Sequence, residues 1–113
     1  MADVTYILGT GEYVRVEIHD DSLDESWSPT GWTFELCLVP RGAVYDAAVA
    51  VWAAAAYQAV TDTNGRVHHT VVAHLEDLTQ TIGIYIPRVM MTHGSDAESP
   101  VPIKARGKVT VER

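Results

Sequence analysis

Hydrophobic and polar residues alternate along much of this 113-residue chain. In Glu12–His19, the side chains of Val14, Val16 and Ile18 fall on one side of an extended chain, which is the pattern of a strand with one buried face. Similar or shorter runs predict further strands at Val4–Leu8, Gly31–Pro40, Val67–Leu75, Gly83–Met91 and Ile103–Glu112. The pattern therefore predicts an all-β domain.

Polar segments with Gly or Pro separate these runs. The acidic loop His19–Gly31 is the first, and TDTNGR at 61–66 predicts a hairpin turn, because Asn-Gly tolerates the positive φ of such turns. Glu76–Ile82 is expected to be a turn region. Pro87 predicts an edge position or a bulge in its strand, since proline cannot donate a ladder hydrogen bond.

Residues 47–60 read AAVAVWAAAAYQAV, and they are the one segment that departs from the strand pattern. Alanine favours a helix, but alanine on every side gives a helix no apolar stripe. The neighbouring strands and turns favour a strand instead. We expect a short helical turn at Asp46–Val51, capped by Asp46, and then a strand over Trp52–Val60, with a helix as the alternative.

Length and composition suit a single domain over residues 1–113. The one cysteine, Cys37, rules out an internal disulfide. The first residues lack the pattern of a signal peptide, and the Ala-rich run is too short to span a membrane, so we expect a protein made without export. The net charge of −7 disfavours nucleic acid as a partner.

Candidate chemistry is sparse. His68 and His74 share one face of their strand but stand about 20 Å apart along it, at ~3.3 Å per residue, too far to ligate one metal ion. The acidic loop lacks the regular spacing and central glycine of a calcium loop. No nucleophile elbow or phosphate-binding loop is visible, and Cys37 has no evident general base. We expect no metal, no cofactor and no enzymatic activity.

Aromatic residues divide into two groups. Trp32 and Trp52 are expected in the core. Trp27 lies in the polar sequence DESWSPTG, where an aromatic side chain is a candidate contact anchor. Charge adds a second candidate contact, because the acids gather in residues 1–40 and the bases at the end of the chain. The possible interface residues are Trp27, Lys104, Arg106 and Lys108.

LTQTIGIY at Leu78–Tyr85 resembles the tyrosine corner of immunoglobulin-like sandwiches, in which a Tyr hydroxyl bonds back to the loop before its strand. The flanking segments are similar, in kind and order, to those of the small immunoglobulin-like virion proteins of tailed bacteriophages, in the style of the N-terminal domain of the baseplate upper protein. The likeness covers roughly residues 12–112. The matching segments read WTFELCLVPRG, VWAAAAYQ, TNGRVHHTVVAHLEDL and IYIPRVMMTHGSDAESPVPIKARGKVTV.

This resemblance implies a single immunoglobulin-like antiparallel β-sandwich of about seven strands, with a tyrosine corner made by Leu78, Gly83 and Tyr85. It implies a structural virion protein on the capsid, at the connector or as a minor tail component. Such a protein would be made in the host cytoplasm and would bind other virion proteins or further copies of itself in a symmetric assembly. The alternative is a virion-surface module that binds a host glycan or protein through an aromatic platform of Trp27, Tyr13 and Tyr57.

Overall fold

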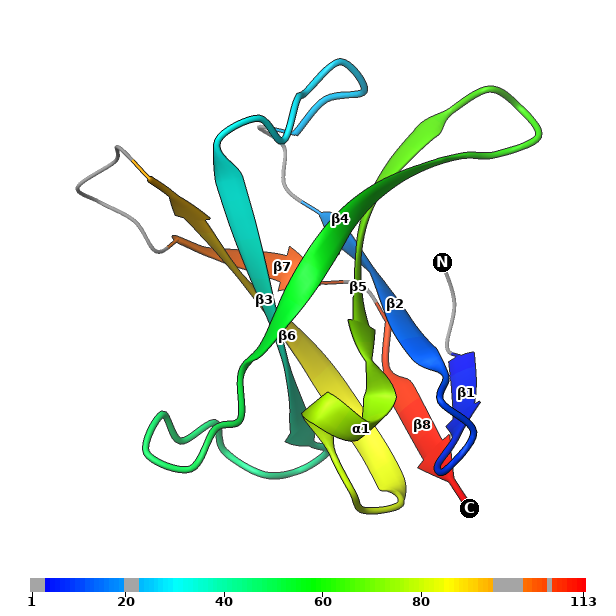
Figure 1. Ribbon diagram of the computed structural model, residues 1–113, viewed down its shortest axis with the longest axis vertical. Helices are drawn as coiled ribbons and strands as arrows, with labels where there is room; N and C mark the ends of the chain where they lie inside the picture. The colour runs from blue at the N-terminus through cyan, green and yellow to red at the C-terminus, as the bar shows by residue number, and fades with distance from the viewer. Residues whose placement is uncertain (1–3, 20–22, 95–100, 106) are drawn as a thin grey trace.

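The computed structural model describes residues 4–19, 23–94, 101–105 and 107–113, and the predicted all-β fold is confirmed (Figure 1). The described part of the chain forms eight strands and one short helix. In chain order these are β1 (Val4–Ile7), β2 (Tyr13–His19), β3 (Trp32–Pro40), β4 (Ala53–Thr61), β5 (Val67–His74), α1 (Leu75–Leu78), β6 (Gly83–His93), β7 (Val101–Ala105) and β8 (Val109–Glu112).

The strands form one continuous sheet with the order β1-β8-β6-β3-β4-β5-β2-β7. Because β7 pairs with both β2 and β6, six of the strands close into a ring, and the sandwich becomes barrel-like. Strand β4 joins the two layers: Ala53–Ala55 pair with β3, and Ala56–Thr61 pair with β5. All neighbours are antiparallel except β1 and β8, which run parallel side by side in Figure 1.

The core lies inside this ring, on the faces that the alternation predicts. Val14, Val16 and Ile18 of β2 are buried, and α1 contributes Leu75 and Leu78. Nearly complete burial of branched side chains provides the main stabilisation, at roughly 1.5–3 kcal/mol for each. Further buried hydrophobic residues are Tyr6, Phe34, Leu36, Leu38, Val71, Ala73, Tyr85, Val89, Met91, Ile103, Val109 and Val111.

The Ala-rich run is a strand, as expected, and the helical alternative is wrong. Asp46 begins a single turn in which its carbonyl accepts from the N–H of Ala50 and its carboxylate from the N–H of Ala48. The chain then enters β4, whose pairing changes from β3 to β5 between Ala55 and Ala56. Ala53 is buried while Ala54 and Ala56 face outward.

Two local expectations need correction. Helix α1 occupies part of the expected turn region Glu76–Ile82. The expected final strand Ile103–Glu112 is interrupted around Gly107, so that β7 begins earlier, at Val101, and β8 is separate. Pro87 agrees with the expected edge position on one side of its strand. It pairs with β3 on the other side, and it lies in the unpaired interval between the β8 partners Gly83–Tyr85 and the β7 partners Val89–Met91.

The β4–β5 hairpin turn forms where TDTNGR predicts it. The N–H of Asp62 donates to the carbonyl of Arg66, and Gly65 has a φ of 81°. No described residue other than glycine has a positive φ, so Asn64 does not share the left-handed conformation. The turn therefore has the form of a type I turn followed by a left-handed glycine.

The open edge of β2 is closed by a side chain. The Tyr6 hydroxyl lies 3.1 Å from the backbone nitrogen of Arg15 and 3.3 Å from its carbonyl oxygen. Strand β1 is protected as well, because Glu12 accepts a hydrogen bond from the N–H of Ile7 and Thr10 donates to the Ile7 carbonyl. These contacts block pairing with another chain at Ile7, as protected edge strands do.

Candidate interaction surface

One outer surface of the sheet is largely apolar. Along β6, Tyr85, Pro87, Val89 and Met91 point into the core, and the residues between them point outward. Ile84 and Ile86 remain 38% and 44% exposed. We call the outward side chains of β3 and β6, together with the adjoining loop 41–52, the β3–β6 face. The outward residues in these strands are Thr33, Glu35, Cys37, Val39, Ile84, Ile86, Arg88, Met90 and Thr92.

The strand register places these outward residues in rows across the sheet. Met90 lies between Glu35 of β3 and Pro102 of β7, while Ile86 is opposite Val39. Among the described outward residues of β3 and β6, only Glu35 and Arg88 are charged. The rest of this surface is aliphatic or weakly polar.

Loop 41–52 adds exposed valines to this face. The N–H of Arg41 donates to the Ile84 carbonyl at 2.8 Å, which fixes the start of the loop against β6. Val44, Val49 and Val51 are 91%, 74% and 57% exposed. Loops are usually polar because water must solvate them, so a loop that exposes three valines is a candidate contact surface.

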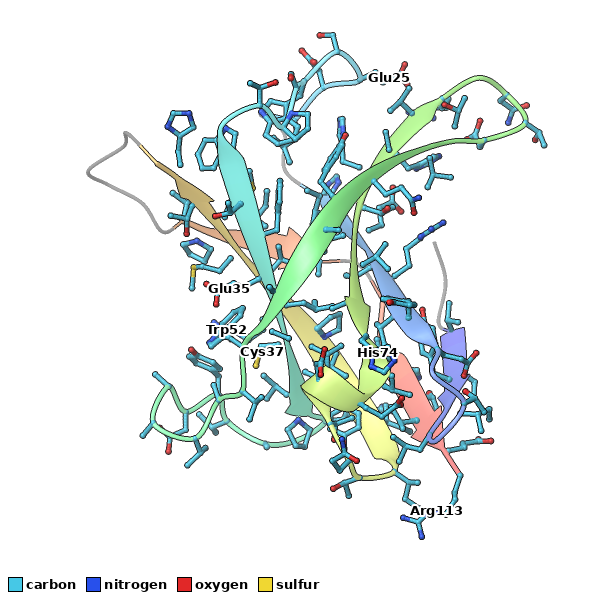
Figure 2. The ribbon with its side chains drawn as sticks, in the orientation of Figure 1. Glu25, Glu35, Cys37, Trp52, His74 and Arg113 are labelled. Carbon is cyan, nitrogen blue, oxygen red and sulfur yellow. The ribbon has the colours of Figure 1, made fainter. Side chains whose placement is uncertain are left out.

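An aromatic–arginine cluster lies in the middle of the face. The Arg88 guanidinium carbon is 3.9 Å from the centroid of the Tyr45 ring, and the Tyr45 and Trp52 rings meet edge to face at 6.5 Å. Trp52 also borders an open hollow of about 450 Å³ with Met90 and Pro102. Figure 2 shows Trp52 next to Glu35 on the same flank of the domain. Trp52 is thus half-buried on the outside of the sheet, not in the expected core.

Cys37 points outward but is covered by loop 41–52. Its thiol accepts a hydrogen bond from the N–H of Val51, and burial raises its pKa. A thiol with a raised pKa is a poor nucleophile at neutral pH. Cys37 therefore helps to hold the loop on the sheet.

The residues of the expected tyrosine corner lie together between α1 and β6. The Tyr85 hydroxyl donates to the Thr81 carbonyl at 2.7 Å and lies 3.0 Å from the Thr79 hydroxyl. Leu78 is buried beside it. Gly83 has a φ of 155°, a conformation that side chains disfavour, and a Cβ there would touch the Tyr85 ring.

Trp27 belongs to an aromatic cluster at the other end of the barrel. Its ring meets those of Phe34, Tyr57 and His69 at 6.4, 5.8 and 5.5 Å. His69 fixes the acidic loop here, with Nε2 2.7 Å from the Asp24 carbonyl oxygen. Trp27 thus packs against side chains of the domain while remaining half-buried, and its role as a contact anchor stays a prediction. With Tyr57 in the same cluster, the expected aromatic platform is not formed, although Tyr13 is 63% exposed.

His68 connects the β4–β5 hairpin to β2 through two carboxylates. Its Nδ1 is 2.6 Å from Glu17 and its Nε2 is 2.9 Å from Asp62. Since carboxylates accept hydrogen bonds, this geometry suits the doubly protonated ring. The hydrogen bonds with Asp62 and then Glu17 raise the pKa of His68, and the bond with His68 is the main cause that lowers the pKa of Asp62.

The basic residues proposed from charge are only partly described. The backbone of Lys104 pairs with His19 of β2, but its side chain lies outside the described residues, as does the whole of Arg106. Lys108 is half-buried between β7 and β8. The acidic residues Asp20 and Asp21 of the first loop also lie outside the described part.

The sequence analysis did not predict the β3–β6 face, although the sequence of β6 contains a sign of it. Ile84 and Ile86 alternate with Tyr85 and Pro87, which point inward and are also apolar, so this part of β6 is apolar on both faces. A strand of this kind is usually covered on both sides. In this domain the core covers its inner face, while on its outer face Tyr45 lies over Arg88 and Ile84 and Ile86 stay exposed.

Metal binding and membrane insertion find no support in the described segments. Residues 4–19, 23–94, 101–105 and 107–113 contain no group of three or more His, Cys, Asp or Glu placed to hold a metal ion. No helix in the same segments is long and apolar enough to cross a membrane. No protein-family model matches the chain, and no curated protein or solved structure shows significant similarity to it.

Proposed function

We propose that this domain is a structural component of a tailed-phage particle, on the capsid, at the connector or in the tail, and that it acts by binding other subunits. The observation that carries the proposal is the β3–β6 face. Val44, Val49 and Val51 of loop 41–52 are widely exposed, and so are Ile84 and Ile86 of β6. Monomeric proteins seldom expose an apolar area of this kind, and where they do it commonly marks a contact with another protein.

Two further observations support a binding role. The Tyr85 hydroxyl donates to the Thr81 carbonyl, which is the contact that the resemblance to small immunoglobulin-like virion proteins leads us to expect. The most conspicuous side-chain cluster of titratable groups, around His68, has its ring nitrogens paired with carboxylates and serves to connect two strands. Such a cluster stabilises the domain and leaves the apolar face as the surface for contacts.

The proposal is tested in particles of the phage that encodes the chain. Particles purified on a density gradient and analysed by quantitative mass spectrometry should contain the protein at a fixed number of copies per particle. Hundreds of copies would identify a capsid component, and a few would identify the connector or tail. Absence of the protein from infectious particles would refute a structural role.

A further inference from the structure

We propose that the β3–β6 face binds the same face of a second copy of this chain across a two-fold axis, so that Glu35 of each copy meets Arg88 of the other. The inference rests on the proposed function, because it assumes that the domain acts by binding other subunits. It names the partner and the contact that the proposed function leaves open. Four features of the face support it: its size, its residue types, its charges and its strand register.

The face is large enough for a weak dimer. Strands β3 and β6 pair over nine residues, and β4, β7 and β8 each add three paired residues beside them. At ~3.3 Å per residue and ~4.8 Å between strands, these paired residues present about 430 Å². Loop 41–52 enlarges the face at one flank, and the total suits an interface smaller than the roughly 800 Å² per partner of the standard kind, as in weak and reversible association.

The residue types in the centre are those that dominate binding energy at interfaces. Tryptophan, tyrosine and arginine are the most enriched side chains at interface hot spots. Trp52, Tyr45 and Arg88 lie together here, in contact through their rings and guanidinium group. Because these contacts already order the side chains, less conformational entropy is lost when the face is covered.

Charge favours a second copy as the partner. The chain carries a net charge of −7, so two copies repel each other over most of their surface. The β3–β6 face is neutral, with the acids Glu35 and Asp46 and the bases Arg41 and Arg88. A surface with equal numbers of acids and bases can complement itself, whereas an acidic or basic surface cannot.

The register fits a two-fold contact. Glu35 is opposite Met90 and Cys37 is opposite Arg88, so Glu35 and Arg88 lie on a diagonal of adjacent rows. In the proposed dimer, the sheets of two copies face each other, and the two-fold axis runs midway between them. If this axis crosses the midpoint of the Glu35–Arg88 diagonal at right angles, each Glu35 lies over the Arg88 of the other copy. An isologous interface forms the same contact twice.

The first measurement is the oligomeric state of the wild-type protein. Sedimentation velocity from about 1 to 100 μM should show a reversible monomer–dimer equilibrium, a range that covers weak and standard interfaces. A wild-type protein that stays monomeric throughout this range overturns the proposal.

The second measurement uses single charge reversals. Glu35→Arg and Arg88→Glu each place like charges together in the homodimer, and each should weaken dimerisation about 10-fold or more. Mixing the two variants should restore dimers, because a face with two arginines then meets a face with two glutamates. Unchanged dimerisation of both single variants, or failure of the mixture to dimerise, overturns the pairing. Far-UV circular dichroism confirms that each variant is folded.

Matched controls come from the opposite end of the domain. Glu25 and Arg66 are an exposed acid and base 3.8 Å apart near the β4–β5 hairpin. Glu25→Arg and Arg66→Glu change the net charge by the same amounts as the test variants, and dimerisation should remain as in the wild type. Equal weakening by these controls would assign the effect to net charge and overturn the proposed face.

The two proposals can fail separately. A chain that is present in particles but monomeric in solution at 100 μM keeps the structural role and overturns the two-fold dimer. A chain that dimerises through Glu35 and Arg88 but is absent from particles supports the dimer and refutes the virion role.

Discussion

Replacement of Tyr85 by phenylalanine removes one hydroxyl and leaves the packed ring in place. The hydroxyl donates to the Thr81 carbonyl at 2.7 Å and lies 3.0 Å from the Thr79 hydroxyl. Thr81 is exposed, so water can replace the lost donor at its carbonyl. We therefore expect a cost of about 1 kcal/mol, the usual net contribution of one hydrogen bond, and not the larger cost of a buried group left unpaired.

Urea and thermal denaturation measure this cost. A change of about 1 kcal/mol lowers the melting temperature of a domain of this size by roughly 4 °C. Tyr13→Phe is the matched control, because the Tyr13 side chain is 63% exposed, and its denaturation midpoint should not change. Equal midpoints for Tyr85→Phe and wild type would show that the hydroxyl contributes nothing, and the interpretation as a stabilising tyrosine corner would be wrong.

Three further predictions concern stability. Tyr6→Phe leaves the part-buried N–H and carbonyl of Arg15 without their hydroxyl partner and should cost about 1–3 kcal/mol in urea denaturation; no change would mean that water reaches this edge. Trp27→Ala removes a half-buried ring from the cluster with Phe34, Tyr57 and His69 and should cost about 2 kcal/mol, whereas a freely exposed anchor would cost almost nothing. Because the pKa of His68 is raised above 6.5 in the folded state, its contribution to stability is complete below pH 6.5 and is lost as the pH rises through the folded-state value. Wild type should thus lose more stability than His68→Gln between pH 6 and pH 9, and parallel pH profiles would contradict the carboxylate pairing.

Alternation predicted the strands well because it depends on neighbouring residues. Val14, Val16 and Ile18 reveal their buried face within a single strand, and the tyrosine corner is contained in eight consecutive residues. The crossing of β4 between layers was harder to foresee, since alanine gives little contrast between the two faces. Context from the surrounding strands decided that case correctly.

Features that depend on distant residues were missed. Trp27 is in a polar loop, and its partners Tyr57 and His69 come from strands far along the chain. Trp52 alternates like a core residue but lies outside the sheet, because loop 41–52 turns back over β3. The interruption between β7 and β8 has only Gly107 as a local sign. In each case tertiary packing sets the environment of the residue. The local pattern of hydrophobic and polar residues holds no information on that packing.

The parallel pairing of β1 with β8 has a mechanical consequence. Val4 is opposite Val109 and Ile7 is opposite Glu112. The chain therefore enters β1 at one end of this strand pair and leaves β8 at the other end. Tension applied between the two ends pulls these strands along their length in opposite directions. All the hydrogen bonds between them then carry the load together, and none can open before the others as in a zipper. The domain should resist stretching along this direction.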